Sequence, residues 1–276
     1  MKWPLAFLVA IYALAVVGLA VFQRRLLYFP DRRLTHPAEA GMSGVEELRL
    51  VTDDGEMLVA WHLPPRKGHP LILYFHGNGG ALVDRVPRFR MFAASGYGLL
   101  AVSYRGYGGS TGQPSEWGLR ADARAGFDFI RAAAPQSRIA VFGESLGTGP
   151  AVALAHDRPV AGILLNAPYA SVRRLYELRG PAVPYRWLLT DQFDSEALIG
   201  AVGVPVMILH GSADPAIPVD EARRLYAAAK EPKRIIVVEG AGHLDAWEGG
   251  GEAPALAALA RWTAAEEPVA AGKERH

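Results

Sequence analysis

The stretch Val141–Gly149 constrains this chain more than any other, because a tight turn in it joins an apolar run to a helical pattern. The run Ile139–Phe142 is typical of a buried strand, and Ala151–His156 predicts a helix. Between them lies Gly-Glu-Ser-Leu-Gly, with Ser145 at its apex. The two glycines let strand and helix crowd together around a strained serine. This context indicates a nucleophile rather than a solvent-facing serine in a glycine-rich turn.

Apolar and amphipathic segments alternate along the rest of the chain. Two half-buried strands joined by an Asp-Asp-Gly turn predict an antiparallel hairpin at a sheet edge. Each later apolar run is followed by a helical pattern, and such alternation predicts parallel strands with right-handed crossovers. The predicted strands are 45–51, 56–63, 71–75, 98–103, 138–142, 160–165, 204–209 and 234–238. We therefore expect the α/β class, with a mostly parallel eight-stranded sheet and helices on both faces.

Polar residues follow several of these strands, where the reactive groups of open α/β sheets collect. A serine hydroxyl needs a base to attack at neutral pH, and His243 is the expected base. A carboxylate must orient the imidazole and stabilise its cation, a role that we give to Asp214. The backbone N–H groups of Leu146 and Asn78, the latter in a glycine-rich turn, are the expected donors to an oxyanion.

Other residues compete for these roles or suggest other chemistry. Asp220 begins a predicted helix, and Asp245 lies too close in sequence to His243 to reach the ring from behind. His210 and His76 are interpreted as structural. No cluster has metal-ligand spacing and no dinucleotide fingerprint opens a strand-to-helix unit, so neither a metal nor a cofactor is expected. The net charge of +1 gives no reason to expect nucleic acid as a partner.

The N-terminus carries a run, Trp3–Phe22, with no charged residue, long enough to cross a bilayer as a helix. We expect a retained single-pass membrane anchor over residues 1–23. The alternative is a signal peptide cleaved near Gly18-Leu19-Ala20. Arg24 and Arg25 follow the span and only Lys2 precedes it, which favours a cytoplasmic domain, whereas an export signal would place the domain on the other side.

With these residues in place, the chain resembles the alpha/beta-hydrolase superfamily in its Ser, Asp, His order and its strand pattern. The segments Tyr104–Gly108, Ser115–Leu119 and Leu26–Pro30 are similar to a membrane-anchored branch that includes acyl-protein thioesterases and monoacylglycerol or lysophospholipid hydrolases. His243-Leu244-Asp245 departs from the usual His-Asn-Asp but keeps the base. The resemblance implies a serine hydrolase that cleaves carboxylic esters or thioesters of small acyl substrates, lipids among them.

The expected organisation follows from these assignments. We predict a linker over residues 24–44, an alpha/beta-hydrolase domain over 45–265 with a small helical lid at about 169–203, and a tail over 266–276. Two other functions stay open at this point. One is a serine peptidase on the same fold, and the other is a binding module that kept the fold and lost its catalysis.

Overall fold

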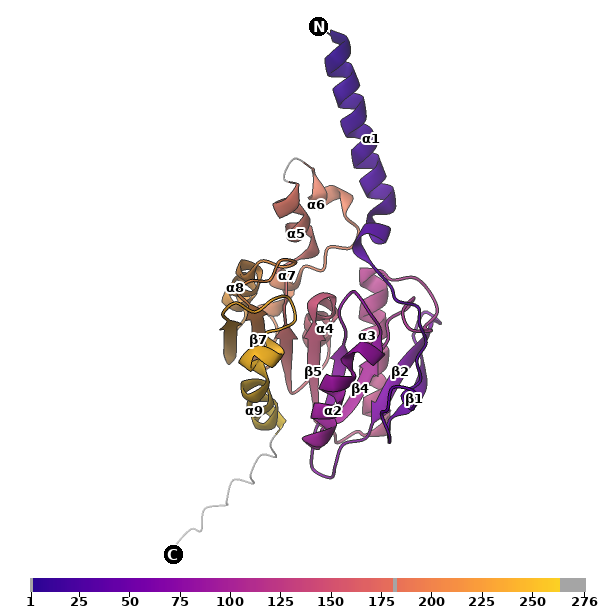
Figure 1. Ribbon diagram of the computed structural model, residues 1–276, viewed down its shortest axis with the longest axis vertical. Helices are drawn as coiled ribbons and strands as arrows, with labels where there is room; N and C mark the ends of the chain where they lie inside the picture. Colours follow the sequence, from indigo (N-terminus) through magenta and orange to yellow (C-terminus); the bar gives the residue numbers. More distant parts are fainter. Residues whose placement is uncertain (1, 181–182, 264–276) are drawn as a thin grey trace, which may run out of the picture.

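A central eight-stranded sheet organises the computed structural model, which describes residues 2–180 and 183–263 (Figure 1). The strand order is β1-β2-β4-β3-β5-β6-β7-β8. Only the pairs β1/β2 and β2/β4 are antiparallel. The strands are β1 (Glu46–Val51), β2 (Met57–Leu63), β3 (Leu71–Phe75), β4 (Gly98–Val102), β5 (Ile139–Glu144), β6 (Gly162–Asn166), β7 (Val206–Gly211) and β8 (Lys233–Val238). The predicted mostly parallel sheet with an antiparallel edge hairpin is confirmed.

Helices cover both faces of this sheet, and one long helix projects from the domain (Figure 1). The helices are α1 (Lys2–Leu27), α2 (Val86–Ala94), α3 (Glu116–Ala133), α4 (Thr148–Asp157), α5 (Val172–Arg179), α6 (Tyr185–Leu188), α7 (Ser195–Ile199), α8 (Val219–Ala228) and α9 (Glu252–Thr263). Short turns of other helical types lie at 82–85, 145–147 and 247–251. Helices α5, α6 and α7 lie in the segment predicted as a lid, and α1 stands at the same end of the domain as α5 and α6.

The core has two halves because side chains of a strand alternate between the sheet faces. In β3, Leu71, Leu73 and Phe75 join the half that includes side chains from α3, α4 and α8. Ile72 and Tyr74 join the other half, with side chains from α2 and α9. All five residues are buried, which explains why the strand has a continuous apolar run instead of alternation.

Three central strands extend beyond their predicted ends. β5 continues to Glu144, β6 to Asn166 and β7 to Gly211. Glu144 and Asn166 are both buried and face each other in the ladder between β5 and β6. The sequence pattern ended these strands at their last apolar residue, whereas in the structure backbone pairing continues through the buried polar residues Glu144 and Asn166.

The C-terminal helix carries a proline, Pro254, in its first turn. α9 begins at Glu252, directly after the turn at 247–251. Pro254 is tolerated two residues further on because the first four N–H groups of a helix have no intrahelical acceptor. The predicted end of the domain at residue 265 and the predicted tail over 266–276 lie outside the described residues.

The turn after β5 is held in a strained conformation against the end of β3. Ser145 has a φ of +49°, a left-handed value that non-glycine residues rarely adopt. A Cβ on Gly143 would lie 2.5 Å from the carbonyl oxygen of Gly147. A Cβ on Gly147 would overlap the carbonyl oxygen of Phe75, the last residue of β3. Glycine is therefore required at both positions, as the sequence predicts.

Candidate functional site

Three side chains from separate segments meet at the carboxyl ends of the central strands. The Oγ of Ser145 lies 2.9 Å from the Nε2 of His243, and the Nδ1 of His243 lies 2.7 Å from the Oδ2 of Asp214. Ser145 follows β5, Asp214 follows β7 and His243 follows β8. The structure thus brings together the three residues that the sequence proposed as nucleophile, acid and base. In this arrangement Nδ1–H faces the carboxylate, which leaves Nε2 free to accept the serine proton.

The side chain of Asp214 is buried and surrounded by hydrogen-bond donors. Its Oδ1 accepts hydrogen bonds from the backbone N–H groups of Ala216 and Ile217, at 2.8 and 2.9 Å. Its Oδ2 also lies 3.3 Å from the Nε2 of His210, and the Asp214 side chain is fully buried. Burial by itself would raise the pKa of Asp214, but hydrogen bonds from His210 and His243 outweigh it and hold that pKa below its ordinary value. The carboxylate therefore stays ionised beside His243.

His210 has a larger part in this arrangement than its interpretation as structural suggested. Its Nε2 lies 2.9 Å from the carbonyl oxygen of Ile217 as well as close to Asp214. Both partners accept, so Nε2 carries the proton. His210 thereby joins the carboxylate to the loop that follows it.

The two backbone donors predicted for an oxyanion lie on turns that side chains fix. The hydroxyl of Tyr169 donates to the carbonyl oxygen of Leu146 over 3.1 Å. Asn78 is held more firmly, because its Nδ2 donates to the carbonyl oxygen of Leu27 over 2.6 Å. Its Oδ1 accepts from the N–H of Phe29 and the hydroxyl of Tyr107, at 3.1 and 2.8 Å. The backbone N–H of Asn78 donates to no acceptor among the described residues, so it is free to bind a ligand oxygen.

His76 stiffens the same turn from behind. Its Nδ1 lies 2.7 Å from the carbonyl oxygen of Gly77, and its ring packs on Tyr104 with 4.3 Å between centroids. Burial lowers the pKa of His76 to about 4. His76 is therefore neutral near pH 7 and serves as the structural residue that the sequence analysis expected.

Glu144 is a residue of this site that the sequence analysis did not single out. Its carboxylate is buried and accepts hydrogen bonds from the N–H of Gly77 (2.9 Å), the hydroxyl of Tyr74 (2.6 Å) and the guanidinium groups of Arg85 and Arg88 (both 2.7 Å). It therefore ties the serine turn to the turn that holds Asn78. Burial alone would raise the pKa of Glu144, but Arg85 and Arg88 lower it to about 2. The sequence did offer one signal for this role, because Glu144 is a charged residue in a turn whose other residues are small or apolar.

The competing acids lie elsewhere. Asp220 pairs with Arg223 on the surface of α8, at 2.9 Å. Asp245 accepts from the N–H of Gly242 within its own loop, at 3.2 Å. Neither is hydrogen bonded to His243, which leaves Asp214 as its carboxylate partner in the described part of the chain.

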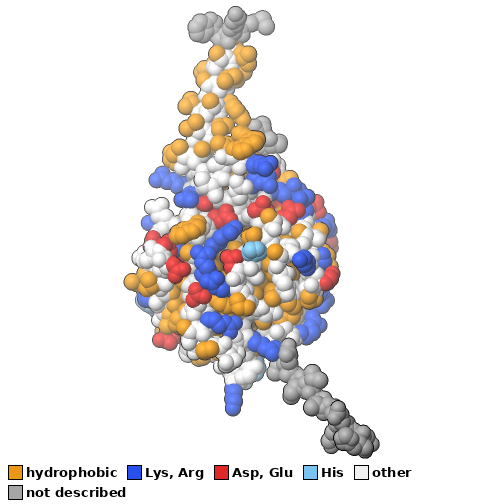
Figure 2. All heavy atoms as spheres, turned by 180° about the vertical axis from the view of Figure 1, so that it is seen from behind, with side chains coloured by type: hydrophobic (Ala, Val, Ile, Leu, Met, Phe, Trp, Pro, Cys, Tyr) orange, Lys and Arg blue, Asp and Glu red, His pale blue; other side chains and the backbone are white. Residues whose placement is uncertain are grey.

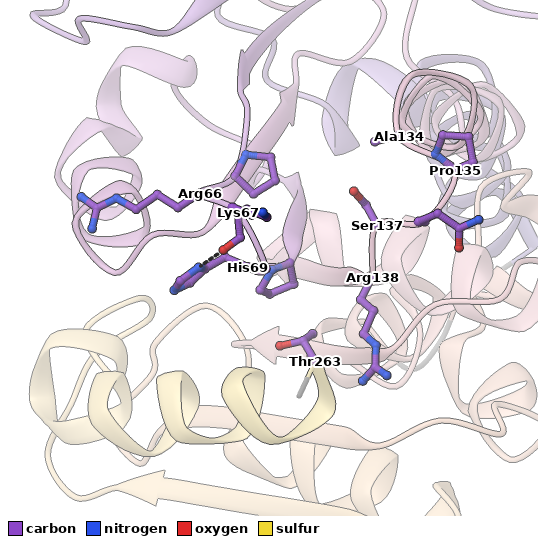
Figure 3. Close-up of a pocket in the computed structure, with 12 residues that line it drawn as sticks. Arg66, Lys67, His69, Ala134, Pro135, Ser137, Arg138 and Thr263 are labelled. Carbon is purple, nitrogen blue, oxygen red and sulfur yellow. Dashed lines mark hydrogen bonds between the residues drawn. The ribbon is translucent and has the colours of Figure 1, made fainter. Parts of the chain in front are cut away.

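A cavity of about 410 Å³ lies at the opposite, amino ends of the strands. Figure 3 shows Ser137 and His69 among its lining residues, but their side chains do not point toward one another. His69 instead lies 3.4 Å from the backbone oxygen of Lys67. Within the residues described, no group of three or more His, Asp or Glu side chains could hold a metal ion. The strand ends near Ser145 are therefore the candidate site.

Known proteins are similar to this chain in sequence or in fold, and several of them align with most of its residues. A family model described as the alpha/beta hydrolase fold matches residues 70–197. The uncharacterized protein Rv2307c of Mycobacterium tuberculosis is 40% identical over 248 residues, which cover 86% of this chain and 87% of that protein. The lysophosphatidylserine lipase ABHD12 of Rattus norvegicus is 29% identical over 244 residues, covering 74% of this chain and 61% of the lipase. The esterase Pf2001 of Pyrococcus furiosus has the same fold, with a TM-score of 0.70 and 17% identity over 86% of this chain and 98% of the esterase.

The Glu144 contacts predict a specific dependence of stability on pH. Replacing Glu144→Gln removes the buried anion that Arg85 and Arg88 share and leaves each with only an exposed acid, so we expect the free energy of unfolding at pH 7 to fall by roughly 3 to 5 kcal/mol. The folded-state pKa of about 2 lies below the ordinary value of 4.5. The stabilisation from this carboxylate is therefore fully present above pH 4.5 and is lost as the pH falls toward 2.

Denaturant unfolding of both proteins across this pH range measures the effect. The difference in free energy between wild type and Glu144→Gln should shrink as the pH falls, whereas the exposed Glu239→Gln should differ little from wild type at every pH. A difference between wild type and Glu144→Gln that stays constant from pH 7 to 3 would contradict the assignment.

Proposed function

Since the chain belongs to the alpha/beta-hydrolase family and is a hydrolase by that membership, we propose that it is a membrane-anchored serine hydrolase of acyl esters or thioesters. The observation that carries the proposal is the unbroken series of contacts from Ser145 through His243 to Asp214, at 2.9 and 2.7 Å. An oriented base within hydrogen-bond reach of a serine is what activates that hydroxyl.

In the first half of the proposed reaction, Ser145 forms an acyl-enzyme. His243 Nε2 takes the proton as the Oγ attacks the carbonyl carbon, and Asp214 stabilises the imidazolium that results. The negative oxygen of the tetrahedral intermediate accepts hydrogen bonds from the backbone N–H groups of Leu146 and Asn78. When the intermediate collapses, His243 returns its proton to the leaving alcohol or thiol, and the acyl group stays on Ser145.

In the second half, water replaces the leaving group. His243 removes a proton from the water as its oxygen attacks the acyl carbon, and a second tetrahedral intermediate forms at the same two donors. Collapse of that intermediate returns the proton to the Oγ of Ser145 and releases the carboxylic acid. The balance is one ester or thioester and one water consumed, and one acid and one alcohol or thiol formed.

The substrate class draws on the relatives and on the N-terminal helix. ABHD12 is named as a lysophosphatidylserine lipase and Pf2001 as an esterase, which supports an acyl ester as substrate. Among the described residues, one helical stretch, Pro4–Leu27, is long and apolar enough to cross a membrane. An enzyme held by such a helix has a high local concentration of acyl lipids, so a lipid ester is the substrate that we favour.

The serine assignment is tested with Ser145→Ala. A fluorophosphonate probe should label the wild-type protein and fail to label this variant. Hydrolysis of p-nitrophenyl esters should fall by a factor on the order of 10⁶, because the nucleophile and its base act as a unit. The exposed Ser95→Ala serves as the matched control and should keep both labelling and turnover. Full ester turnover by Ser145→Ala would refute the proposal.

The oxyanion role of the Asn78 turn has its own test. Asn78→Ala removes the side-chain bonds to Leu27, Phe29 and Tyr107, so its backbone N–H is no longer held in place. Loss of a whole donor costs about 10² to 10³ in kcat, and loosening one should lower kcat by roughly 10 to 100-fold with little change in KM. Tyr107→Phe removes only one of these bonds and should have a smaller effect. An unchanged kcat in Asn78→Ala would rule out this role.

The charges that flank the apolar run favour one side of the membrane. Because Arg24 and Arg25 follow the apolar run, we propose that the domain lies in the cytoplasm. A C-terminal fusion to a reporter that is active only in the cytoplasm should therefore be active. Activity of a reporter that functions only after export would place the domain on the opposite side.

A further inference from the structure

Gln23 directly follows the apolar run of α1, and its side-chain amide is hydrogen bonded to the lid. Gln23 is buried, and its Nε2 donates to the carbonyl oxygen of Leu188 over 3.1 Å. Its Oε1 accepts from the N–H of Thr190 over 2.7 Å. A helical run of about 20 residues matches the roughly 30 Å of a bilayer's hydrocarbon, so the run Trp3–Phe22 ends where the hydrocarbon ends. Gln23 therefore fixes this part of the lid at the level of the membrane surface.

A second set of contacts fixes the same place. The guanidinium of Arg24 pairs with Asp191 at 2.9 Å, and the hydroxyl of Tyr28 donates to the same carboxylate over 3.1 Å. Asp191 is buried, and the ion pair adds a directional contact to the amide bonds. Residues 188–191 and the end of α1 are thus joined through Gln23, Arg24 and Tyr28, which fixes the height of the lid relative to the apolar run.

Trp187, directly before the residues that bond to the end of α1, has a strongly exposed apolar side chain. Trp187 on α6 has 82% of its surface exposed, and Leu178 on α5 has 53%. The two helices pack together through Tyr176 and Tyr185, whose ring centroids are 5.5 Å apart. Tryptophan is enriched at the membrane–water interface, where its ring meets apolar chains and its N–H meets headgroups. An exposed Trp at this height is explained by contact with lipid.

Positive charge accompanies these apolar side chains. The acids Glu177, Asp191 and Glu196 are each paired with an arginine. By contrast, Arg179 bonds only to the carbonyl oxygens of Leu175 and Ala216, and Arg186 is in no ion pair within the described residues. Figure 2 shows Lys and Arg side chains gathered around the base of the apolar helix. Unpaired arginines at a membrane surface attract the phosphates of anionic lipids.

We propose that the lid face formed by Leu178, Arg179, Arg186 and Trp187 rests on the bilayer that holds α1, with the arginines on anionic phospholipid headgroups. This inference rests on the proposed membrane anchor and adds a second contact between domain and lipid. It also bears on the substrate. The lid segment begins at Tyr169, which bonds to Leu146 beside Ser145. An acyl lipid in the same leaflet is then close to the candidate site without passing through bulk water.

The absence of cysteine from the chain makes a direct test available. Trp187→Cys in the full-length protein gives one site for the fluorophore NBD, whose emission shifts to the blue in an apolar environment. After reconstitution into phosphatidylcholine–phosphatidylglycerol vesicles, we expect a blue shift relative to detergent and quenching by spin-labelled lipid. Lys67→Cys, exposed at the opposite end of the sheet, is the control and should show neither change. Equal emission from the two probes would overturn the proposal.

The headgroup contact is tested by adding Arg179→Gln and Arg186→Gln to the Trp187→Cys protein. Each arginine near an anionic surface favours the lipid-bound state of the lid face over the unbound state by about fivefold. Without these arginines, the blue shift should fall in vesicles that contain phosphatidylglycerol. In vesicles of phosphatidylcholine alone, the substitutions should have no effect. An undiminished shift in the anionic vesicles would overturn the role of the arginines.

Two further measurements separate this inference from the proposed function. Fluorophosphonate labelling reports on Ser145 alone, so a labelled protein without a blue shift overturns the lid contact and leaves the hydrolase standing. A blue shift in an unlabelled protein supports the lid contact while the serine mechanism fails. Vesicle flotation reports on α1, and a full-length chain that does not float would overturn both the anchor and this surface.

Discussion

The turn after β5 lies so close to the end of β3 that Gly147 has no room for a Cβ, and it folds back so tightly toward α4 that Gly143 has none either; the geometry of the site depends on this close packing. It brings the turn with Ser145 next to the turn with Asn78. The left-handed φ of Ser145 is a strained conformation that persists only when the surroundings determine it fully. Here the two glycines that flank the serine are tightly packed, Gly147 against the backbone of Phe75 and Gly143 against Ala151 of α4.

Buried electrostatics then hold the two turns in register. Glu144 accepts from Gly77 on one turn while its own backbone belongs to the other, and Arg85 and Arg88 compensate its charge. Asp214 is likewise fixed by two backbone N–H groups and by His210 before it meets His243. Donors and charges that are positioned in advance do not have to reorganise during a reaction, which is the main source of electrostatic catalysis.

The N-terminal helix is connected to the same region. Leu27 at its end and Phe29 just after it bond to Asn78, and Gln23 and Arg24 bond to the segment predicted as a lid. A retained anchor would thus hold the domain at one height above the bilayer, with the carboxyl ends of the strands toward the lipid. Within the segment predicted as a linker over residues 24–44, Tyr28 is buried and its hydroxyl donates to Asp191.

Local pattern by itself determined the sheet, the helices on both faces and the placement of Ser145, Asp214 and His243 after strands, because hydrophobic periodicity marks strands and helices and glycines mark the tight turns between them. It ended β5, β6 and β7 too early, because a buried polar residue such as Glu144 or Asn166 looks like the start of a loop. Only the tertiary structure decided the partners of Glu144, Asn78 and His210. Glu144 and Gly77 are 67 positions apart, and Asn78 is 51 positions from Leu27. Such contacts form when folding buries polar groups that must then find donors or acceptors, and no short-range pattern encodes which ones they find.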